Sequence, residues 1–261
     1  METTILFRKN IENEEELQVA EQYFNVVEHR TECYDSLVIG RYSVLPYYQE
    51  LEFDLAKMGS NLINSYQQHR WIADFEYYEH LKDYTPETWD DYTFSQANEG
   101  KFIIKGRTNS RKYEWNKLMF ASNKKQAMVI AGELMKDGLI GPQGVIYRKY
   151  IPLKTFEIGL NDLPFTNEFR FFFYKEHLLS HGYYWSSAEE NVIANASISS
   201  DGIDFARKIA KIASEHVNFF VLDIAEKEEG GWILIEVNDG QQSGLSENDP
   251  HVLYQNLIKF L

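Results

Sequence analysis

The sequence predicts a mixed α/β fold of the α+β class, and three observations support this. The chain has 261 residues, of which 44% are hydrophobic, so it has enough apolar side chain for a large core. In the N-terminal part, short apolar runs alternate with segments of helical periodicity, which is typical of alternating strands and helices. In the last third, two apolar runs flank the charged, glycine-containing turn 226–231, which predicts a β-hairpin.

Residues 1–99 are expected to form an N-terminal α/β region. Its apolar runs predict strands, and segments with apolar residues three and four positions apart predict helices. In chain order, these are a strand at 3–7, a helix at 12–24, a strand at 36–43, a helix at 47–58 and a helical, aromatic segment at 61–83. The sequence Thr85-Pro86-Glu87-Thr88 favours a helix start, because proline fits the first turn of a helix. A turn at Asn98–Gly100 is expected to close this region.

The rest of the chain is expected to form two subdomains, a small one at 100–150 and a C-terminal one at 151–261. The same patterns of apolar spacing predict their elements. In chain order, these are a strand at 101–105, a polar loop at 106–114, a helix at 124–136, strands at 145–151, 168–174 and 177–185, a helix at 202–216, strands at 219–225 and 232–238, and a helix at 251–260.

The charge balance of the chain excludes some partners. Asp and Glu number 40 and Lys and Arg number 26, which gives a formal net charge of -14. Such a surface repels phosphate backbones, so nucleic acid is disfavoured as a partner. No apolar run reaches the roughly 20 residues of a membrane helix, and the N-terminus lacks the pattern of a signal peptide. With Cys33 as its single cysteine, the chain forms no intrachain disulfide, and we expect a cytoplasmic protein.

Acidic and amide side chains lie within the predicted hairpin. Because alternate side chains of a strand share a face, Trp232, Leu234, Glu236 and Asn238 are expected on one face of its second strand. Asp223 lies inside the apolar first strand, where a charge is costly without a partner. Oxygen ligands of this kind suit Mg²⁺. From the pattern alone, Asp223 and Asn238 could equally be turn formers at strand ends, with Glu236 at an exposed edge.

Lys105 ends the predicted strand at 101–105 and precedes a polar loop that contains Gly106, Arg107 and Arg111. A lysine in this position can hold a phosphate as a point charge, with help from backbone N–H groups. The GxxxxGK[ST] pattern of a Walker A loop is missing. A solvated basic hairpin tip is the alternative interpretation.

Two arginines lie in otherwise apolar strands, Arg148 in VIYRKYI and Arg170 in EFRFFFY. An arginine in such a strand needs an anionic partner, which can be a carboxylate of the protein or a phosphate. Glu168 shares a face with Arg170, so a structural ion pair is an alternative to a ligand site. The polar loop 238–245 contains two glycines, which would let its backbone approach a ligand closely, although a plain turn would have the same composition.

The order of these features resembles the ATP-grasp superfamily. A strand that ends in lysine is followed by a strand with an arginine, a Glu-Xxx-Arg strand, a strand with an aspartate and a Glu-Xxx-Asn strand. The closing sequence VLDIA…GGWILIEVNDGQQSGL…DP…LY adds to the resemblance, which covers residues 100–261. More narrowly, the chain resembles the clade common in phages and bacteria that is marked by one lysine and two arginines.

The resemblance implies a nucleotide held between two α+β subdomains, with 1–99 as a pre-grasp region. The residues that would bind ATP are Lys105, Arg148, Lys149, Tyr150, Ile151 and Arg170. Of these, Lys105 and Arg170 would be catalytic, and the backbone of 149–151 would form the adenine hinge. The residues that would bind Mg²⁺ are Asp223, Glu236 and Asn238. The candidates for acceptor contacts, chosen by position, are Arg107, Arg111, Gln241 and Ser243.

The resemblance implies an ATP-dependent ligase that activates a carboxylate as an acyl-phosphate for attack by an amine or thiol. The carboxylate and the acceptor would belong to a small molecule or a peptide. A nucleotide-binding regulatory or interaction protein without turnover is an alternative, since an acidic surface with many Tyr and Trp suits a protein interface. A nucleic-acid end-processing ligase that forms a lysyl-AMP on Lys105 is a weaker alternative, because the KxDG string is absent and the net charge is -14.

Overall fold

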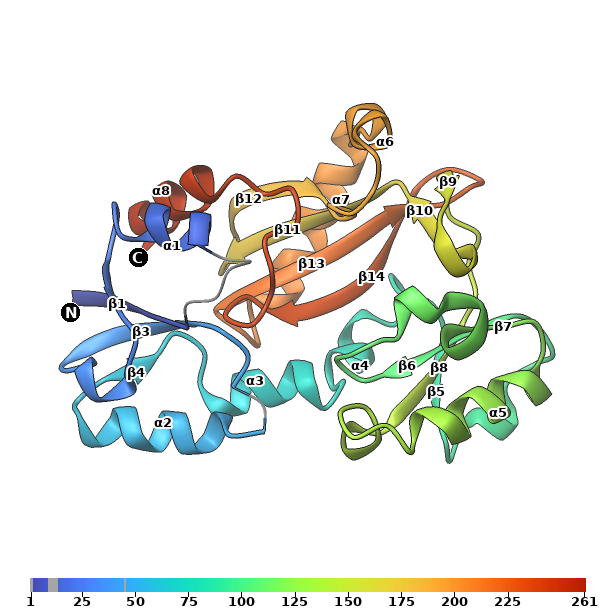
Figure 1. Ribbon diagram of the computed structural model, residues 1–261, viewed down its shortest axis with the longest axis horizontal. Coiled ribbons are helices and arrows are strands. Elements are labelled where there is room, and N and C mark those ends of the chain that lie inside the picture. Colours follow the sequence, from blue (N-terminus) through green and yellow to red (C-terminus); the bar gives the residue numbers. More distant parts are fainter. Residues whose placement is uncertain (1, 9–13, 45) are drawn as a thin grey trace.

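The computed structural model describes residues 2–8, 14–44 and 46–261 of the chain. Within these residues, helices connect three four-stranded sheets and one two-stranded sheet, which confirms the mixed α+β class. Figure 1 shows the N-terminal strands in blue, a second group of strands in green and the C-terminal sheet in orange. No helix of the described residues is long and apolar enough to span a membrane.

The N-terminal sheet is parallel, with the strand order β2-β1-β3-β4. Its elements are β1 Glu2–Phe7, α1 Glu14–Ala20, β2 Asn25–Val27, β3 Ser36–Arg41, α2 Tyr48–Lys57, β4 Asn61–Leu62, α3 Tyr66–Ala73 and α4 Tyr77–Leu81. The predicted strands at 3–7 and 36–43 and the helix at 47–58 are confirmed. The helix predicted at 12–24 ends at Ala20, and residues 12 and 13 lie outside the described residues. The segment 61–83 begins as a strand, because Leu62 pairs with Val38, and becomes helical only afterwards.

The sheet of the small subdomain is antiparallel, with the order β5-β8-β6-β7. Its elements are β5 Thr88–Asp90, β6 Phe102–Gly106, β7 Phe120–Ala121, α5 Lys124–Leu134 and β8 Val145–Lys149. The helix start predicted at residues 85–88 is wrong, because this segment leads into β5. Thr88 pairs with Arg148, and the Lys149 N–H donates to the Glu87 carbonyl at 2.8 Å. These sheet hydrogen bonds outweigh the local helix signal.

Strand β5 precedes residue 100 in the sequence but belongs to the sheet of the small subdomain. The ring of Phe94 stacks on that of Tyr147 with 3.9 Å between centroids, and both pack in one core with Phe102. Part of the segment 84–99 therefore lies against the small subdomain. The division of the chain into 1–99, 100–150 and 151–261 stays a prediction.

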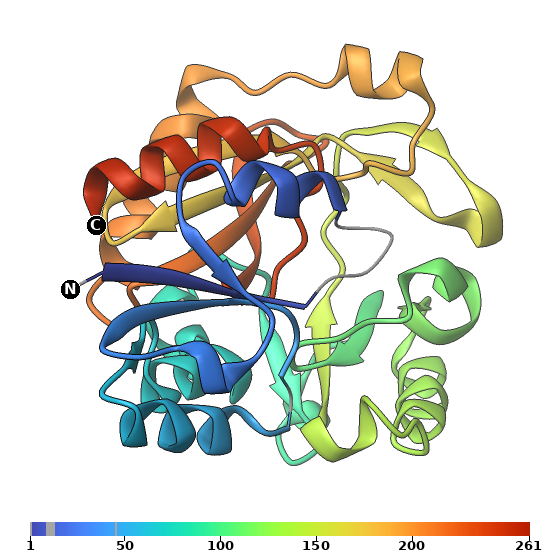
Figure 2. The ribbon, with the colours of Figure 1, turned by 60° about the vertical axis from the view of Figure 1, so that its left-hand side comes forward.

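The C-terminal sheet is antiparallel, with the order β12-β11-β13-β14. The elements of this part are β9 Thr155–Ile158, β10 Pro164–Thr166, β11 Glu168–Tyr174, β12 His177–Tyr183, α6 Glu190–Asn195, α7 Ser200–Ala213, β13 Phe219–Glu226, β14 Trp232–Asp239 and α8 Pro250–Phe260. Successive side chains of β11 point to opposite faces. Phe171 packs with Ile209 of α7 on one face, and Phe172 packs with Leu253 of α8 on the other. Ile5 of β1 joins this second core, so the N-terminal region covers part of the same face (Figure 2).

Strand β14 contains a bulge that the sequence pattern does not predict. Its ladder pairs Glu236 with Asp223, and after a register shift pairs Leu234 with the next residue of β13, so Ile235 is an extra residue. Leu234 is buried in the same core as Val237, whereas Glu236 lies on the other face. The predicted common face of Leu234 and Glu236 is therefore wrong, because the bulge reverses the alternation between them.

Candidate active site

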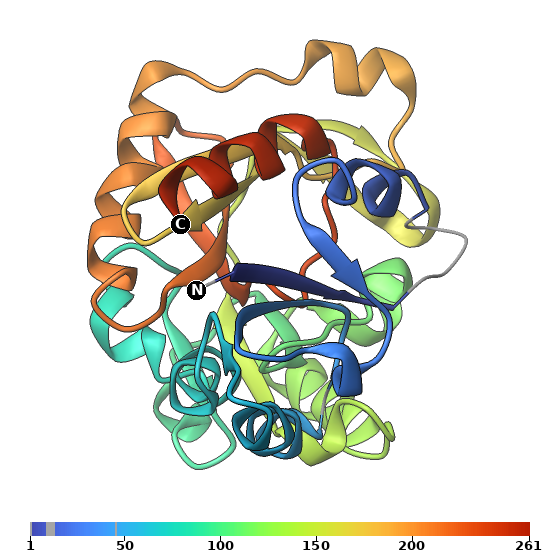
Figure 3. The same ribbon diagram turned by 90° about the vertical axis from the view of Figure 1, so that its left-hand side faces the viewer.

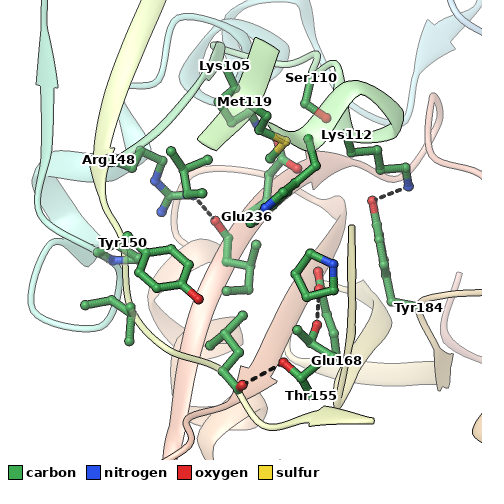
Figure 4. Close-up of a pocket in the computed structure, with 18 of the residues that line it drawn as sticks. Lys105, Ser110, Lys112, Met119, Arg148, Tyr150, Thr155, Glu168, Tyr184 and Glu236 are labelled. Carbon is green, nitrogen blue, oxygen red and sulfur yellow. Dashed lines mark hydrogen bonds and ion pairs between the residues drawn. The ribbon is translucent and has the colours of Figure 1, made fainter. Parts of the chain in front are cut away.

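A cavity of about 120 Å³ lies between the small subdomain and the C-terminal sheet (Figure 4). It is lined by strands of both sheets, by the connection after β8 and by the loop that follows β6. The lining residues used below are Ile103, Lys105, Lys112, Trp115, Met119, Arg148, Lys149, Tyr150, Ile151, Leu153, Glu168, Tyr184 and Glu236. Figure 4 shows that the side chains of Lys105, Tyr150 and Glu236 reach the cavity from different elements.

Lys105, near the end of β6, forms an ion pair with Glu236 of β14. The two side chains are 7% and 15% exposed, so little water solvates either charge. Each charge therefore depends on the other, and removal of one partner would leave the other buried and uncompensated. This ion pair connects the small subdomain to the C-terminal sheet across the cavity.

Arg170 of β11 and Asp223 of β13 form a bidentate ion pair, in which Nε and Nη2 each lie 2.8 Å from a carboxylate oxygen. The Asn238 side-chain amide donates to the same carboxylate at 3.1 Å. Asp223 is also the residue opposite Glu236 in the sheet, which brings the three predicted oxygen ligands to one place. Burial alone would lower the pKa of Arg170, but the charge and hydrogen bonds of Asp223 raise it above its ordinary value.

Arg148 of β8 is only 5% exposed, and its contacts are to neutral groups. Its guanidinium donates to the Ile235 carbonyl and to the hydroxyls of Thr85 and Thr88. Among the described residues, no Asp or Glu lies within ion-pair distance of it. The sequence left open whether each of these arginines pairs with a carboxylate of the protein. Arg170 does, and its partner is Asp223 rather than Glu168. Among the described residues, Arg148 has no such partner. A buried guanidinium that lines a cavity without a carboxylate partner favours an anionic ligand.

Glu168 lies on the floor of the cavity and is almost fully buried. Burial, and then the charge of Asp223, raise the pKa of its carboxyl from 4.5 to about 8. The Thr166 hydroxyl donates to it at 3.1 Å. At neutral pH this carboxyl is therefore mainly protonated, and it can donate a hydrogen bond as well as accept one.

The Lys112 ammonium closes one side of the cavity. It donates to the Tyr184 hydroxyl at 3.0 Å and lies 5.0 Å from the centre of the Trp185 ring (Figure 4). Burial, followed by the charge of Asp223, raises the pKa of Tyr184 well above its ordinary value, so its hydroxyl stays neutral. The same ring lies 5.0 Å from the Arg170 guanidinium, which links the loop after β6 to the Arg170–Asp223 pair.

Residues 93–257 match a family model described as ATP-grasp domain, R2-K clade family 3. The match spans well over half of the chain. The chain belongs to this ATP-grasp family. No curated protein matches the sequence. The presence of one lysine and two arginines as a clade signature stays a prediction.

Solved structures share the ATP-grasp fold of the whole chain. D-cycloserine synthetase DcsG has a TM-score of 0.65 at 11% identity, with 99% of each chain covered. D-alanine–D-alanine ligase from Bacillus anthracis, in complex with ATP, has a TM-score of 0.56 at 10% identity, covering 91% of this chain and 84% of the ligase. ATP-grasp ligase PsnB, in complex with precursor peptide PsnA2 and AMPPNP, has a TM-score of 0.55 at 11% identity. The match covers 99% of this chain and 96% of PsnB. At these identities, the likeness concerns the fold.

The residues proposed for Mg²⁺ fit a divalent cation that is also bound by phosphates. Asp223 and Glu236 face each other on neighbouring strands of the ATP-grasp sheet, and Asn238 contacts Asp223. Two carboxylates and an amide are too few oxygens to enclose Mg²⁺, which usually keeps waters and substrate phosphates among its ligands. Among the described residues, no group of three His, Cys, Asp or Glu side chains is arranged to hold a metal ion.

Arg107 and Arg111 lie in the loop after β6 but do not line the cavity. Arg111 forms an ion pair with Asp137, which follows α5 in the same small subdomain. The side chain of Arg107 lies beside Gly144. Their role as acceptor contacts stays a prediction, and in this structure both side chains engage their own subdomain.

A second hollow of about 1050 Å³, the polar groove, lies between the N-terminal region and the loop that follows β14. Its lining residues used below are Gln241, Ser243, Gly244, Leu245, Glu247 and Asn248. Gln241 is buried and accepts from the Gly40 N–H at 3.0 Å, and the Ser243 hydroxyl donates to the Asp239 carbonyl at 2.8 Å. These two residues thus lie on the groove, with side chains that also hold the loop in place.

Several residues of the ATP-grasp cavity were missed by the sequence prediction: Lys112, Trp115, Met119, Glu168 and Tyr184. Glu168 was considered only as a partner of Arg170. The run Tyr183–Trp185 at the end of the predicted strand 177–185 could have drawn attention to Tyr184. The contacts of the loop residues Lys112, Trp115 and Met119 depend on how this loop folds over the C-terminal sheet, for which the sequence has no periodic signal.

Proposed function

We propose that the chain is an ATP-dependent, ADP-forming ligase that joins a carboxylate to an amine or thiol. The observation that supports this most is Arg148, a buried guanidinium on the cavity that has no carboxylate partner among the described residues. A triphosphate would supply the missing negative charge. Lys105 and Glu236 line the same cavity, and Asp223 with its partner Arg170 lies beside Glu236 in the sheet, which suits phosphoryl transfer by positioning and charge neutralisation.

The adenine ring is proposed to bind at the apolar part of the cavity, which includes Ile103, Met119 and Leu153. The chain turns there through Lys149, Tyr150 and Ile151. The backbone N–H of Tyr150 donates to the backbone carbonyl of Lys101. None of the described residues forms a hydrogen bond with the backbone of Ile151. The N–H and carbonyl of Ile151 are therefore available for the edge of an adenine ring. The neutral carboxyl of Glu168 is proposed to bind the ribose hydroxyls.

Asp223, Glu236 and Asn238 are proposed to bind Mg²⁺ together with the phosphates. The bound ion would neutralise charge on the transferred phosphoryl group. For Glu236 to bind it, Lys105 must leave its ion pair, and its ammonium is then free for the α- and β-phosphates. Nucleotide binding would thus exchange one buried ion pair for contacts with the ligand, and Lys105 and Glu236 would remain compensated.

In the proposed reaction, a carboxylate oxygen attacks the γ-phosphorus of ATP, the bond to the β-phosphate oxygen breaks, and ADP leaves. The neutral acceptor amine then attacks the acyl carbon, a C–N bond forms, and phosphate leaves with the electrons of the C–O bond. The nitrogen loses a proton to solvent. Arg170 would hold the phosphoryl oxygens while charge develops on them, and the loop with Lys112 would exclude water. We place this reaction in the cytoplasm, with a small molecule or peptide as acceptor.

Calorimetric titration with ADP and Mg²⁺, followed by an assay of ADP release, tests this proposal. We expect ADP to bind only weakly without Mg²⁺, and repeated turnover of ATP to require both a carboxylate and an acceptor. Tight ATP binding without turnover on any carboxylate–amine pair would instead support a regulatory nucleotide-binding protein. Covalent label on Lys105 from α-labelled ATP would support a lysyl-AMP intermediate. No binding of ADP at millimolar concentration would contradict the proposal.

A further inference from the structure

The loop that follows β14 returns across the C-terminal sheet where Arg170 of β11 pairs with Gly182 of β12. Cross-strand partners point to the same face of a sheet, so the missing side chain of Gly182 leaves room beside that of Arg170. The loop fills this room, because a Cβ atom on Gly182 would lie 2.2 Å from the Glu247 carbonyl oxygen and 2.5 Å from the Asn248 nitrogen. The Glu247 N–H donates to the Tyr183 carbonyl at 3.0 Å. Glycine is therefore required for the loop backbone to approach β12 this closely.

One buried amide joins this loop to the strand of Arg170. Asn248 is 4% exposed, and its side-chain nitrogen donates to the Arg170 backbone carbonyl at 3.2 Å and to the Leu245 carbonyl at 2.8 Å. The first bond attaches the loop to β11, and the second closes the turn 245–248. Asn248 thus determines where this turn, and Gly244 just before it, lie relative to β11.

The loop also supplies a contact of the Arg170 guanidinium. Its Nη1 donates to the Gly244 carbonyl at 2.8 Å, while Nε and Nη2 donate to Asp223. A guanidinium has five N–H groups, so these contacts with the described residues leave two for a ligand. Asp223 holds one side of the planar group and the Gly244 carbonyl holds another, and together they fix the direction in which the two remaining N–H groups point.

We propose that Asn248 is a positioning residue for Arg170. It holds the Gly244 carbonyl against the guanidinium, and so directs the two remaining N–H groups at the transferred phosphoryl group. Without this contact the guanidinium keeps its ion pair with Asp223 but loses the group that holds its other side. A small displacement of a catalytic group is costly, because its contacts with the reacting atoms need one geometry. This inference rests on the ligase function proposed above and adds a residue to its phosphoryl site.

Two nucleotides separate the positioning of Arg170 from a general loss of structure. AMPPNP carries a third phosphoryl group that ADP lacks, and Arg170 is proposed to contact that group. Calorimetric titration of the full chain with each nucleotide, in the presence of Mg²⁺, gives the ratio of the two affinities. We expect Asn248→Ala to bind AMPPNP about five-fold more weakly than the wild type, because a charge-assisted contact is misaligned. Its affinity for ADP should stay within about two-fold of the wild-type value.

Gly182→Ala tests the same link without a change in Asn248, and it decides the test if Asn248→Ala does not fold. Its Cβ atom displaces the loop from β12, so we expect the same selective loss for AMPPNP. Asn256→Ala is the matched control. Asn256 of α8 donates to the Leu179 carbonyl of β12 at 2.7 Å, and Figure 3 shows this helix in red beside the C-terminal sheet. Loss of this bond should lower the melting temperature and leave the affinity ratio unchanged.

A double variant shows whether Asn248 acts through Arg170. Arg170→Lys keeps a positive charge beside Asp223 but lacks the planar guanidinium that binds Asp223 and Gly244 together. We expect it to lower the affinity for AMPPNP by itself, and Asn248→Ala to cause no further loss in this background, since effects of coupled residues do not add. Equal losses for ADP and AMPPNP in Asn248→Ala or Gly182→Ala, an unchanged ratio in either, the same selective loss in Asn256→Ala, or additive losses in the double variant would each overturn this inference.

The wild type separates this inference from the ligase proposal. Normal binding of ADP by the wild type, with any of those results in the variants, would remove the role of Asn248 and leave the ligase function standing. No binding of ADP or AMPPNP by the wild type would overturn both.

Discussion

The buried guanidinium of Arg148 has hydrogen bonds but no countercharge among the described residues. A charge in such a place is costly for folding, and it is compensated when an anion binds. We therefore expect Arg148→Met to unfold at the same temperature as the wild type or slightly above it. We expect its affinity for ADP to fall by about 100-fold, the loss of a desolvated charged contact.

Thermal unfolding and calorimetric titration measure the two effects of Arg148→Met separately. Arg207→Met, on the exposed side of α7, is the matched control and should leave ADP binding unchanged. Wild-type affinity for ADP in Arg148→Met would contradict the assignment of this arginine to the phosphates.

The carboxyl of Glu168 is expected to make stability depend on pH. Its pKa in the folded chain is about 8, against an ordinary value of 4.5. Between these values the folded state binds more protons than the unfolded state, so stability is fully present below about pH 4.5 and is lost as pH rises toward 8. We expect the melting temperature of Glu168→Gln to fall less steeply over this range than that of the wild type. Parallel curves for the two proteins would contradict the raised pKa.

The predicted site residues came from the order of residue types along the chain, and their partners could not be predicted in this way. Asp223 and Glu236 belong to one hairpin, so their proximity follows from strand pairing, and the structure confirms that they pair. Lys105 meets Glu236 only because two separate sheets meet at the cavity, which is a long-range contact without a local signal. The same holds for Arg148, whose lack of a carboxylate partner appears only in three dimensions.

Most helices and strands were predicted within a few residues, because the apolar periodicity follows which face of each element is buried. Strand β11 is the clearest case, since Phe171 and Phe172 point into two different cores. Two elements were predicted wrongly for physical reasons that the local sequence does not contain. The segment 85–88, predicted to begin a helix, leads instead into β5, which pairs with β8, and the bulge at Ile235 shifts the faces of β14.

The loop after β6 is held closed over the cavity by contacts with the C-terminal part of the chain. Lys112 donates to Tyr184 at 3.0 Å, Asn116 donates to Asp162 at 2.9 Å, and Asn161 donates to the Tyr113 carbonyl at 2.7 Å. The cavity of about 120 Å³ beneath it is smaller than the roughly 300 Å³ of typical ligand pockets. We therefore expect the loop to open when a nucleotide enters.

Tyr184→Phe removes one of these contacts and keeps the ring. We expect the loop to open more often, and association of a fluorescent ATP analogue, measured by stopped flow, to become about two- to ten-fold faster, since the lost hydrogen bond is worth about 0.5–1.5 kcal/mol. Tyr113→Phe, with an exposed ring in the same loop, is the control and should associate at the wild-type rate. An unchanged rate in Tyr184→Phe would show that this contact does not limit entry.

The N-terminal region is part of the same folded unit as the C-terminal sheet. Ile5 and Leu17 share a core with Val221 and Leu257, so removal of the region would expose one face of the sheet to water. A buried polar network adds to this core. The His69 ring contacts one oxygen of Asp239 at 3.0 Å, directly after the residues proposed to bind Mg²⁺. The position of the metal strand thus depends on residues far away in the sequence.

Asn64 tests this dependence, because its fully buried amide connects the two parts. It donates to Asp239 at 2.9 Å and accepts from the Phe219 N–H at 2.8 Å. Asn64→Ala leaves these buried partners unsatisfied, so we expect a loss of about 3 kcal/mol in the free energy of unfolding. Asn61→Ala, at an exposed position of β4, should change stability little.

Urea unfolding of Asn64→Ala, followed by far-ultraviolet circular dichroism and by tryptophan fluorescence, shows whether the chain unfolds as one unit. We expect the two signals to shift to lower urea together, since the shared core couples the N-terminal region to the C-terminal sheet. The affinity for ADP and Mg²⁺ should fall as the structure around Asp239 loosens. Two separate transitions, with the C-terminal sheet as stable as in the wild type, would show instead that the metal strand folds without the N-terminal region.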